Sequence, residues 1–294
     1  MQVRIRRGIA ALIALTAATA LAIGPAGAGS AASRHSASAA SLRAFGITSD
    51  GKVMAEFTTD KPEELNWVRR ISGLVNDTAA IGIDFRVQDG KFYAVGNRGG
   101  VYTISLPTGA QDPVVVTKVS QLGVALQGTN FGVDFNPAAD RLRVISDTGQ
   151  NLRHNLNDNT TVPDTPLSTD SCAPAVTGVS AAAYTNNDLN SATATTLFDI
   201  NTTTGQVVIQ SPANSGLLAP TGALGTSVGS NAGLDIYSDL SNGKTVSNSA
   251  YATLVLPNGD ATLNAVDLTT GAATRIGDPF PLAITDIALA LDSN

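Results

Sequence analysis

One hexapeptide, Ile81-Gly-Ile-Asp-Phe-Arg86, recurs along the chain at nearly regular intervals. Its clearest further copies are Phe131-Gly-Val-Asp-Phe-Asn136 and Ala232-Gly-Leu-Asp-Ile-Tyr237, and its weaker copies are Gly178-Val-Ser-Ala-Ala-Ala-Tyr184 and Ile284-Thr-Asp-Ile-Ala-Leu289. The central positions of the copies, residues 84, 134, 182, 235 and 286, are separated by 50, 48, 53 and 51 residues. A period near 50 residues with about four strands in each repeat is typical of β-propeller blades. The repeat therefore predicts five blades.

The sequence between the copies favours strands. Short β-branched and aromatic segments alternate with turn signals, and no segment after residue 28 has a sustained helical period. In the first repeat, four strands are expected over residues 81–86, 91–96, 101–106 and 114–119. Tight hairpins are expected where glycine and asparagine accept positive φ angles, at Asp50-Gly51, Asp89-Gly90, Asn242-Gly243 and Asn258-Gly259. The chain is predicted to be all-β.

The two ends of the repeat region predict how the ring closes. The fifth copy, near the C-terminus, supplies a single strand. Three more strands are expected at residues 42–48, 52–58 and 66–72, so the C-terminal strand would complete a four-stranded antiparallel blade with them. Closure of this kind removes exposed sheet edges. We therefore predict one five-bladed β-propeller over residues 42–294; the alternative is a sandwich or two small β domains.

The N-terminus has the features of a signal peptide, predicted over residues 1–28. Arg4, Arg6 and Arg7 precede an uncharged apolar run at residues 9–23, and small residues follow at Pro25-Ala-Gly-Ala28. The run is shorter than the roughly 20 residues of a transmembrane helix, so an uncleaved anchor is the less favoured alternative. Residues 29–41, rich in Ala and Ser, are predicted to be a flexible leader. We expect a secreted protein; the sequence leaves Sec and twin-arginine export open.

Composition limits the classes of partner. With 294 residues, 43% hydrophobic and 14% charged, the chain is too apolar for a disordered protein. Without residues 1–28 it carries 15 basic and 24 acidic residues. This charge argues against nucleic acid and anionic membranes as partners; an extracellular protein or a glycan is expected instead. Cys172 is the single cysteine, so no internal disulfide is expected, and a buried, an exposed or an intermolecularly linked thiol all stay open.

Several segments of the chain resemble a family of secreted bacterial proteins catalogued as domain of unknown function 4394. The most specific of them runs from Phe131-Gly-Val-Asp-Phe-Asn-Pro137 through Arg141-Leu-Arg-Val-Ile-Ser-Asp-Thr-Gly-Gln-Asn151-Leu-Arg153. Shorter ones are Phe45-Gly-Ile-Thr-Ser-Asp-Gly51, Tyr102-Thr-Ile-Ser105, Ala182-Ala-Tyr-Thr-Asn-Asn187 and Asp267-Leu-Thr-Thr-Gly271. The resemblance covers about residues 43–290. It implies a propeller-like all-β fold and export, and it brings no established activity, ligand or catalytic residue.

The repeat places an acid at the same position in four of its five copies. These acids are Asp84, Asp134, Asp235 and Asp286, and Ala182 stands in the remaining copy. Because side chains alternate along a strand, each acid faces away from its two apolar neighbours. One hypothesis is a metal site in the central channel, with calcium as the candidate cation and no other cofactor, because hard cations prefer oxygen ligands. The favoured hypothesis is structural, with each carboxylate accepting a backbone N–H from the next blade.

Other polar residues give weaker signals. His154 is expected at the surface, which leaves no partner for a Ser-His-Asp triad. Arg141 and Arg143 share a strand face and are expected to pair with the nearby acids Asp140 and Asp147 rather than to bind an anion with Arg153. Trp67, beside Arg69 and Arg70, is expected to pack in the core or at a sheet edge rather than to stack on a sugar.

The motifs of common enzyme classes are absent from the sequence. It contains no Gly-x-Ser-x-Gly elbow, dinucleotide fingerprint or phosphate-binding loop. The leading hypothesis is an exported, non-catalytic propeller that binds another molecule through its loops or central channel. The main alternative is a secreted hydrolase or lyase using Asp carboxylates, with calcium as an assisting ion, because one acid pair leaves no linear signature. A structural module of the cell surface is a third hypothesis.

Overall fold

The computed structural model describes residues 41–170, 172 and 174–293, all of which belong to one compact unit. The predicted signal peptide (1–28) and leader (29–41) lie outside these residues, except for Ser41. The described part consists of strands β1 to β20 and one short 3₁₀ turn, η1 (Ala213–Ser215). Within it, no helix has the length and apolar character that a membrane span needs. The prediction of an all-β fold is confirmed.

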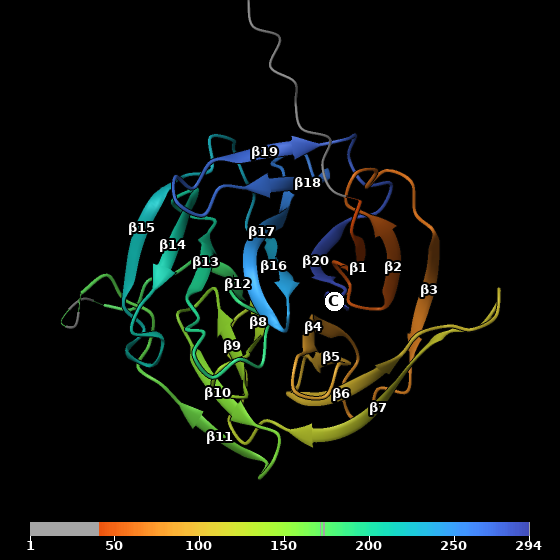
Figure 1. The fold of residues 1–294 in the computed structure, drawn as a ribbon, viewed down its shortest axis with the longest axis horizontal. Coiled ribbons are helices and arrows are strands. Elements are labelled where there is room, and N and C mark those ends of the chain that lie inside the picture. The colour runs from red at the N-terminus through yellow and green to blue at the C-terminus, as the bar shows by residue number, and fades with distance from the viewer. Residues whose placement is uncertain (1–40, 171, 173, 294) are drawn as a thin grey trace, which may run out of the picture. The chain divides into compact units, whose positions relative to one another are not determined.

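Three antiparallel sheets have four strands each, arranged in chain order from the centre outward (Figure 1). The first consists of β8 (Phe131–Asn136), β9 (Arg141–Ser146), β10 (Asn151–Asn155) and β11 (Thr160–Pro163). The second consists of β12 (Val179–Tyr184), β13 (Leu197–Asn201), β14 (Gln206–Gln210) and β15 (Leu218–Ala223). The third consists of β16 (Ala232–Ser241), β17 (Lys244–Val255), β18 (Ala261–Val266) and β19 (Ala273–Ile276).

The remaining strands form one eight-stranded sheet in the order β20-β1-β2-β3-β7-β6-β5-β4. They are β1 (Arg43–Thr48), β2 (Val53–Thr58), β3 (Trp67–Ser72), β4 (Ala80–Arg86), β5 (Lys91–Gly96), β6 (Gly100–Ser105), β7 (Val114–Gln121) and β20 (Ile284–Leu289). Only β3 and β7 run parallel, and they pair through two residue pairs, Ile71 with Val114 and Ser72 with Val115. The prediction of four-stranded antiparallel sheets is thus confirmed for three sheets, whereas in the fourth the outer strands β3 and β7 meet and join eight strands into one sheet.

The last strand pairs with the first one, as the sequence predicts. In the antiparallel β1–β20 ladder, Phe45 lies opposite Ala288 and Gly46 opposite Ile287. The innermost strands β4, β8, β12, β16 and β20 each contact the next in this order, and β20 contacts β4. These five strands, called the inner strands below, therefore form a closed cycle around the centre of the propeller-like arrangement in Figure 1.

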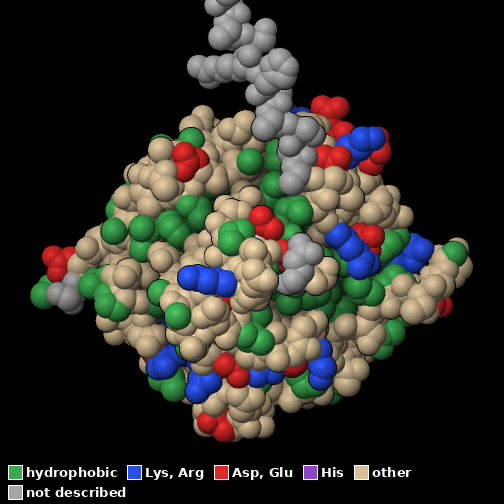
Figure 2. All heavy atoms as spheres, viewed as in Figure 1, with side chains coloured by type: hydrophobic (Ala, Val, Ile, Leu, Met, Phe, Trp, Pro, Cys, Tyr) green, Lys and Arg blue, Asp and Glu red, His purple; other side chains and the backbone are tan. Residues whose placement is uncertain are grey.

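Apolar side chains fill the spaces between neighbouring sheets. Ile83 packs with Phe45 and Met54 on one side of β4, while Val133 and Phe135 of β8 pack with residues of β5. Alternate residues of an inner strand thus face opposite neighbours. On the face shown in Figure 2, charged side chains stand in small separate groups among uncharged surface.

The glycine of the repeated hexapeptide allows the inner strands to approach closely. A Cβ atom on Gly132 would lie 2.5 Å from the backbone nitrogen of Ala182, and one on Gly233 would lie 2.6 Å from the Cα of Asp286. Real Cβ atoms do not approach backbone atoms so closely, so any larger residue would force β8 and β12 apart. Glycine therefore has a packing role in the repeat that the sequence alone does not reveal.

The predicted hairpin turns occur where expected. Asn242 and Gly243, between β16 and β17, both have positive φ angles, 53° and 70°. This is the backbone of a primed turn, whose twist suits the right-handed twist of the two strands. In the first repeat, observed strands β4 to β7 begin and end within two residues of the predicted bounds.

Candidate functional site

The four repeated aspartates lie on inner strands, and all are buried, with 2–5% of each residue exposed. Each carboxyl accepts a backbone N–H from another inner strand. The donors are Phe135 N to Asp84 Oδ2 (2.6 Å), Tyr184 N to Asp134 Oδ1 (3.0 Å), Leu289 N to Asp235 Oδ2 (2.5 Å) and Ile83 N to Asp286 Oδ2 (2.9 Å). Four of the five contacts in the cycle of inner strands thus contain a carboxyl-to-backbone hydrogen bond.

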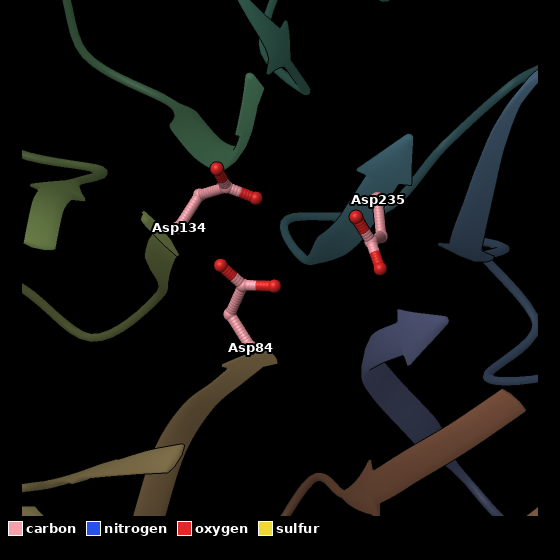
Figure 3. Close-up of side chains that lie close together, drawn as sticks. All are labelled: Asp84, Asp134 and Asp235. Carbon is pink, nitrogen blue, oxygen red and sulfur yellow. The ribbon is translucent and has the colours of Figure 1, made fainter. Parts of the chain in front are cut away.

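Three of these carboxyls converge. Asp84, Asp134 and Asp235 each offer an oxygen within 4.8 Å of the other two, and Figure 3 shows them directed toward a common space from β4, β8 and β16. Asp286 does not belong to this group of three. Oxygen ligands at such spacing are what a hard divalent cation requires, so these are the described residues that could hold one.

Burial governs the protonation of the carboxyls. Desolvation raises the pKa of Asp235 to about 6. It raises the pKa of Asp84 and of Asp134 well above the ordinary value, and the negative charge of neighbouring aspartates raises both further. Buried carboxylates a few ångströms apart do not all ionise together. Without a cation, the group therefore retains protons to a higher pH than isolated carboxyls would.

The fifth inner strand, β12, carries no acid toward β16. Ala182 packs with Tyr184 and Ile145 on the side of β9, whereas Ala183 packs with Leu234 of β16. Ala183 is therefore the structural counterpart of Asp84, and the predicted correspondence of Ala182 is wrong by one residue. The β12–β13 and β4–β5 pairings have the same irregularity, and matching the two aligns Ala181 with Gly82 and therefore Ala183 with Asp84. The weak copy lacks the glycine and acid that would have revealed this shift.

A further buried acid escaped the sequence reasoning. Asp199 lies on β13 opposite Ala182, is 0% exposed, and neither of its carboxyl oxygens has a hydrogen-bond partner among the described residues. Desolvation raises the pKa of Asp199 well above the ordinary value, although the charge of Arg143 opposes this. A carboxyl without partners at such depth is neutral at moderate pH, because burial of an unpaired charge is costly.

Arg143 is buried, with 2% exposed, and connects two sheets. It donates to Asp164 Oδ2 (2.7 Å), Asn151 Oδ1 (2.8 Å), Asn214 Oδ1 (2.7 Å) and the Tyr184 hydroxyl (3.2 Å). Its acid partner is therefore Asp164 instead of the predicted Asp140 or Asp147. The alternative of an anion site on the surface does not fit a guanidinium that is occupied and buried.

The two acids predicted to pair with these arginines have other roles. Asp140 accepts both Nε and Nη2 of Arg86 at 2.7 Å, and this bidentate pair lowers the pKa of Asp140. Asp147 accepts the backbone N–H groups of Thr129 and Asn130, each at 3.0 Å. The acids nearest in sequence are therefore not the partners of these arginines, because strand pairing places Asp140 and Asp147 beside other elements.

The prediction of a surface position for His154 is wrong. The residue lies on β10 and is 0% exposed, with Ser120 Oγ 2.7 Å from Nε2 and Thr161 Oγ1 2.9 Å from Nδ1. Desolvation lowers the pKa of His154, so the ring is neutral at physiological pH. The alternation of β10 turns this side chain toward β7, a pairing that periodicity alone does not specify. Hydroxyl groups contact both ring nitrogens, which is not the arrangement of a Ser-His-Asp triad.

Trp67 lies on β3, between β2 and β7, and packs partly buried against the core cluster that contains Phe45. Its indole N–H donates to Glu56 Oε2 at 2.9 Å, and its ring lies 6.1 Å from that of Phe45 between centroids. Arg69 donates to the carbonyl of Ala110 at 2.5 Å. These contacts fit the favoured packing interpretation. Cys172 is exposed, so the buried alternative for this thiol is wrong.

A small polar cavity of about 90 Å³ lies where the inner strands begin. Its walls include Asp286 and Thr285 from β20, together with Asn130 and Asn231, which precede β8 and β16. A cavity of this size accommodates a few water molecules or one small polar group. Of the four repeated aspartates, only Asp286 lines this cavity.

Two replacements of Asp134 should separate the effect of its hydrogen bond on stability from the effect of its charge. We expect Asp134→Ala to lower the free energy of unfolding by about 1–2 kcal/mol, because Tyr184 N loses its acceptor while repulsion among carboxyls is relieved. Asp134→Asn keeps an acceptor oxygen and should remain close to the wild type at pH 5. Urea unfolding at pH 5, 6.5 and 8 measures both.

The same variants test the protonation of the group. The folded pKa values lie above the unfolded value of about 4, so the folded state binds more protons and its stability falls as pH rises through this window. Asp134→Asn removes one of the titrating groups and should reduce the loss between pH 5 and pH 8. If the free energy of unfolding of Asp134→Asn depended on pH as that of the wild type does, the proposed retention of protons by the folded group would be wrong.

Comparisons with known proteins give the family but no activity. The family model described as "Domain of unknown function (DUF4394)" matches residues 53–288, which confirms the resemblance noted from the sequence. No curated protein matches the chain.

Solved structures similar to this chain share little sequence with it. They include the WD40 domain of Toxoplasma gondii coronin (14% identity, TM-score 0.40, covering 77% of this chain and 54% of that one). Myxococcus xanthus glutaminyl cyclase is similar at 12% identity and TM-score 0.42, over 78% of this chain and 97% of that one. A protein of unknown function from Bacteroides thetaiotaomicron VPI-5482 matches at 12% identity and TM-score 0.43, over 86% and 68%. The chain spans about half of the coronin chain. None of these similarities is close enough to transfer a ligand or an activity.

Proposed function

The chain belongs to the family described as a domain of unknown function (DUF4394), which supplies no activity, and we propose that it is an exported, non-catalytic binding module on a five-bladed propeller. The five blades are the three four-stranded sheets and the two halves of the eight-stranded sheet, β20-β1-β2-β3 and β7-β6-β5-β4. The closed cycle of five inner strands supports this division, and so does the shortness of the parallel β3–β7 ladder.

The proposal of a non-catalytic protein rests on the hydrogen bonds that the central carboxyls already make. A hydrolase or lyase needs an acid and a base that reach a substrate. Here Asp84, Asp134 and Asp235 are buried and accept backbone N–H groups between inner strands. The cavity at the start of the inner strands is lined by apolar, amide and hydroxyl groups and by two acids, Asp50 and Asp286, and none of the three converging carboxyls belongs to its lining.

The proposal is tested with chain recovered from the culture medium of an exporting bacterial host. Its N-terminus should be Gly29, as expected from cleavage after Ala28. Thermal-shift measurements with glycans, Ca²⁺, Mg²⁺ and EDTA should then give at least one glycan that raises Tm, while Ca²⁺ and EDTA leave Tm unchanged. Chromatography of the stabilising glycan after long incubation should recover it intact.

Two outcomes would replace the proposal. Cleavage of a glycan that Asp134→Asn abolishes would establish the hydrolase or lyase alternative. A rise in Tm with Ca²⁺ that Asp134→Asn removes would establish a cation site at the converging carboxyls. Retention of the chain inside the cell with residues 1–28 intact would contradict export.

A further inference from the structure

A polar groove extends outward from the cavity at the start of the inner strands. Asn130 lines both this cavity and a neighbouring cleft of about 420 Å³, which continues through Thr202 and Thr203 into a third cleft of about 490 Å³. The two clefts are called the hydroxyl groove below. Their volumes fall in the range of about 300–1,000 Å³ that is usual for ligand sites.

The hydroxyl groove is lined by residues from three sheets. Its walls come from the segments that precede β12 and β16, from the turn after β13, and from Asn130 before β8 and Asp147 after β9. Beneath it, β12 and β16 meet through small apolar residues such as Ala181 and Ala183, at the one contact of inner strands that lacks an aspartate hydrogen bond. Thr202 Oγ1 donates to the carbonyl of Gly178 at 2.9 Å and fixes the floor of the groove.

The side chains of the groove are mostly uncharged and hydroxylated. They include Thr177, Thr203, Thr204, Ser227 and Ser230, and the lining contains no Lys, Arg or His. Among the described residues, the hydroxyls of Thr177, Ser227 and Ser230 have no hydrogen-bond partner, so their donors and acceptors are available to a ligand.

The scarcity of charged residues in the lining of the groove argues against charged ligands. The only ionisable group in the two clefts is Asp147, whose carboxylate already accepts the N–H groups of Thr129 and Asn130. An anionic polymer would require basic side chains, and a polycation would require more available carboxylates. A peptide binding by strand addition would require an open sheet edge, whereas these clefts are lined by turns and connecting segments apart from Ala223, the last residue of the outer strand β15.

We propose that the hydroxyl groove binds a neutral glycan. Sugar hydroxyls donate and accept hydrogen bonds in the same way as the serine and threonine side chains of the lining. Val228 offers a small apolar contact for C–H groups, and the clefts contain no aromatic ring for stacking. Hydrogen bonds then supply most of the affinity, so we expect a Kd on the order of 1 mM. This inference rests on the proposed binding function and specifies its ligand.

Saturation-transfer NMR on the secreted chain tests the inference. The probes are the hexasaccharides of α-glucose, β-glucose, N-acetylglucosamine, xylose and mannose, with heparin and decalysine as charged comparisons. At least one neutral hexasaccharide should bind, and Ser230→Arg should weaken its binding at least tenfold by placing a long charged side chain in the groove. The matched control is Ser241→Arg, an exposed serine at the other end of β16, which should bind as the wild type does.

The outcomes separate the ligand class from the binding function. If only heparin or decalysine binds, and Ser230→Arg abolishes that binding, the inference of a neutral glycan ligand is wrong. The proposal that the chain is a binding module would then still stand. A hexasaccharide that binds Ser230→Arg and the wild type equally would overturn the groove as the site. If no probe binds at 10 mM, the neutral glycan is overturned, and the proposed function then depends on the wider thermal-shift screen. Equal Tm values for the two variants exclude misfolding as the cause of a loss.

Discussion

Arg143→Ala should destabilise the chain by about 3–5 kcal/mol, the usual effect of breaking a buried ion pair by removal of one partner. The substitution removes the donors to Asp164, Asn151, Asn214 and Tyr184 together. It also removes the only positive charge that lowers the pKa of the buried Asp199. Arg143→Lys should recover little of the loss, because one ammonium cannot reproduce the planar set of guanidinium donors.

Arg141→Ala is the matched control for this prediction. Arg141 lies two residues earlier on β9, is partly exposed, and donates only to the carbonyls of Ala139 and Asp140. Its loss should change the free energy of unfolding by less than about 0.5 kcal/mol. Urea unfolding followed by tryptophan fluorescence and circular dichroism measures both variants. Equal midpoints for Arg143→Ala and Arg141→Ala would contradict a structural role for the buried guanidinium.

Gly132→Ala should destabilise the chain by about 2–4 kcal/mol, although it adds a single methyl group. The new Cβ would lie 2.5 Å from the nitrogen and 2.9 Å from the Cβ of Ala182. Movement of β12 to relieve this contact would lengthen the hydrogen bond from Tyr184 N to Asp134. The steric cost of the new methyl group and the weakening of this hydrogen bond therefore add. The free energy of unfolding in urea is again the measurement.

Gly123→Ala controls for the loss of backbone freedom. Gly123 does not have a positive φ angle, and a Cβ there would approach no atom more closely than 3.7 Å. This variant should be neutral or slightly stabilising, because alanine reduces the entropy of the unfolded chain. If Gly132→Ala were equally neutral, the inner strands would have room to separate, and the packing role of the repeated glycine would be refuted.

The repeat made most of the fold predictable. Three clear copies of the hexapeptide set the period, and the aspartate within them identified a polar position on three inner strands, β4, β8 and β16. The turn dipeptides then placed the hairpins, because the φ angles they require are local properties of Asn and Gly. The pairing of β20 with β1 followed from counting strands in the incomplete repeats.

The contacts that were missed depend on tertiary pairing. Asp164 stands 21 residues after Arg143 and reaches it only because the β9–β10–β11 hairpins fold back. His154 is buried because β10 presents it to Ser120 of β7, in another sheet. The parallel meeting of β3 and β7 depends on how two neighbouring sheets twist at their rims. None of these relations has a local signature in the sequence.

The pairing of Phe45 with Ala288 has a consequence for how the chain is made. Residues about 240 positions apart must meet before the ladder between β1 and β20 forms, and such distant contacts are slow to form because a long loop must close first. Because β20 is synthesised after all the other described strands, this ladder is among the last parts of the sheet that can form.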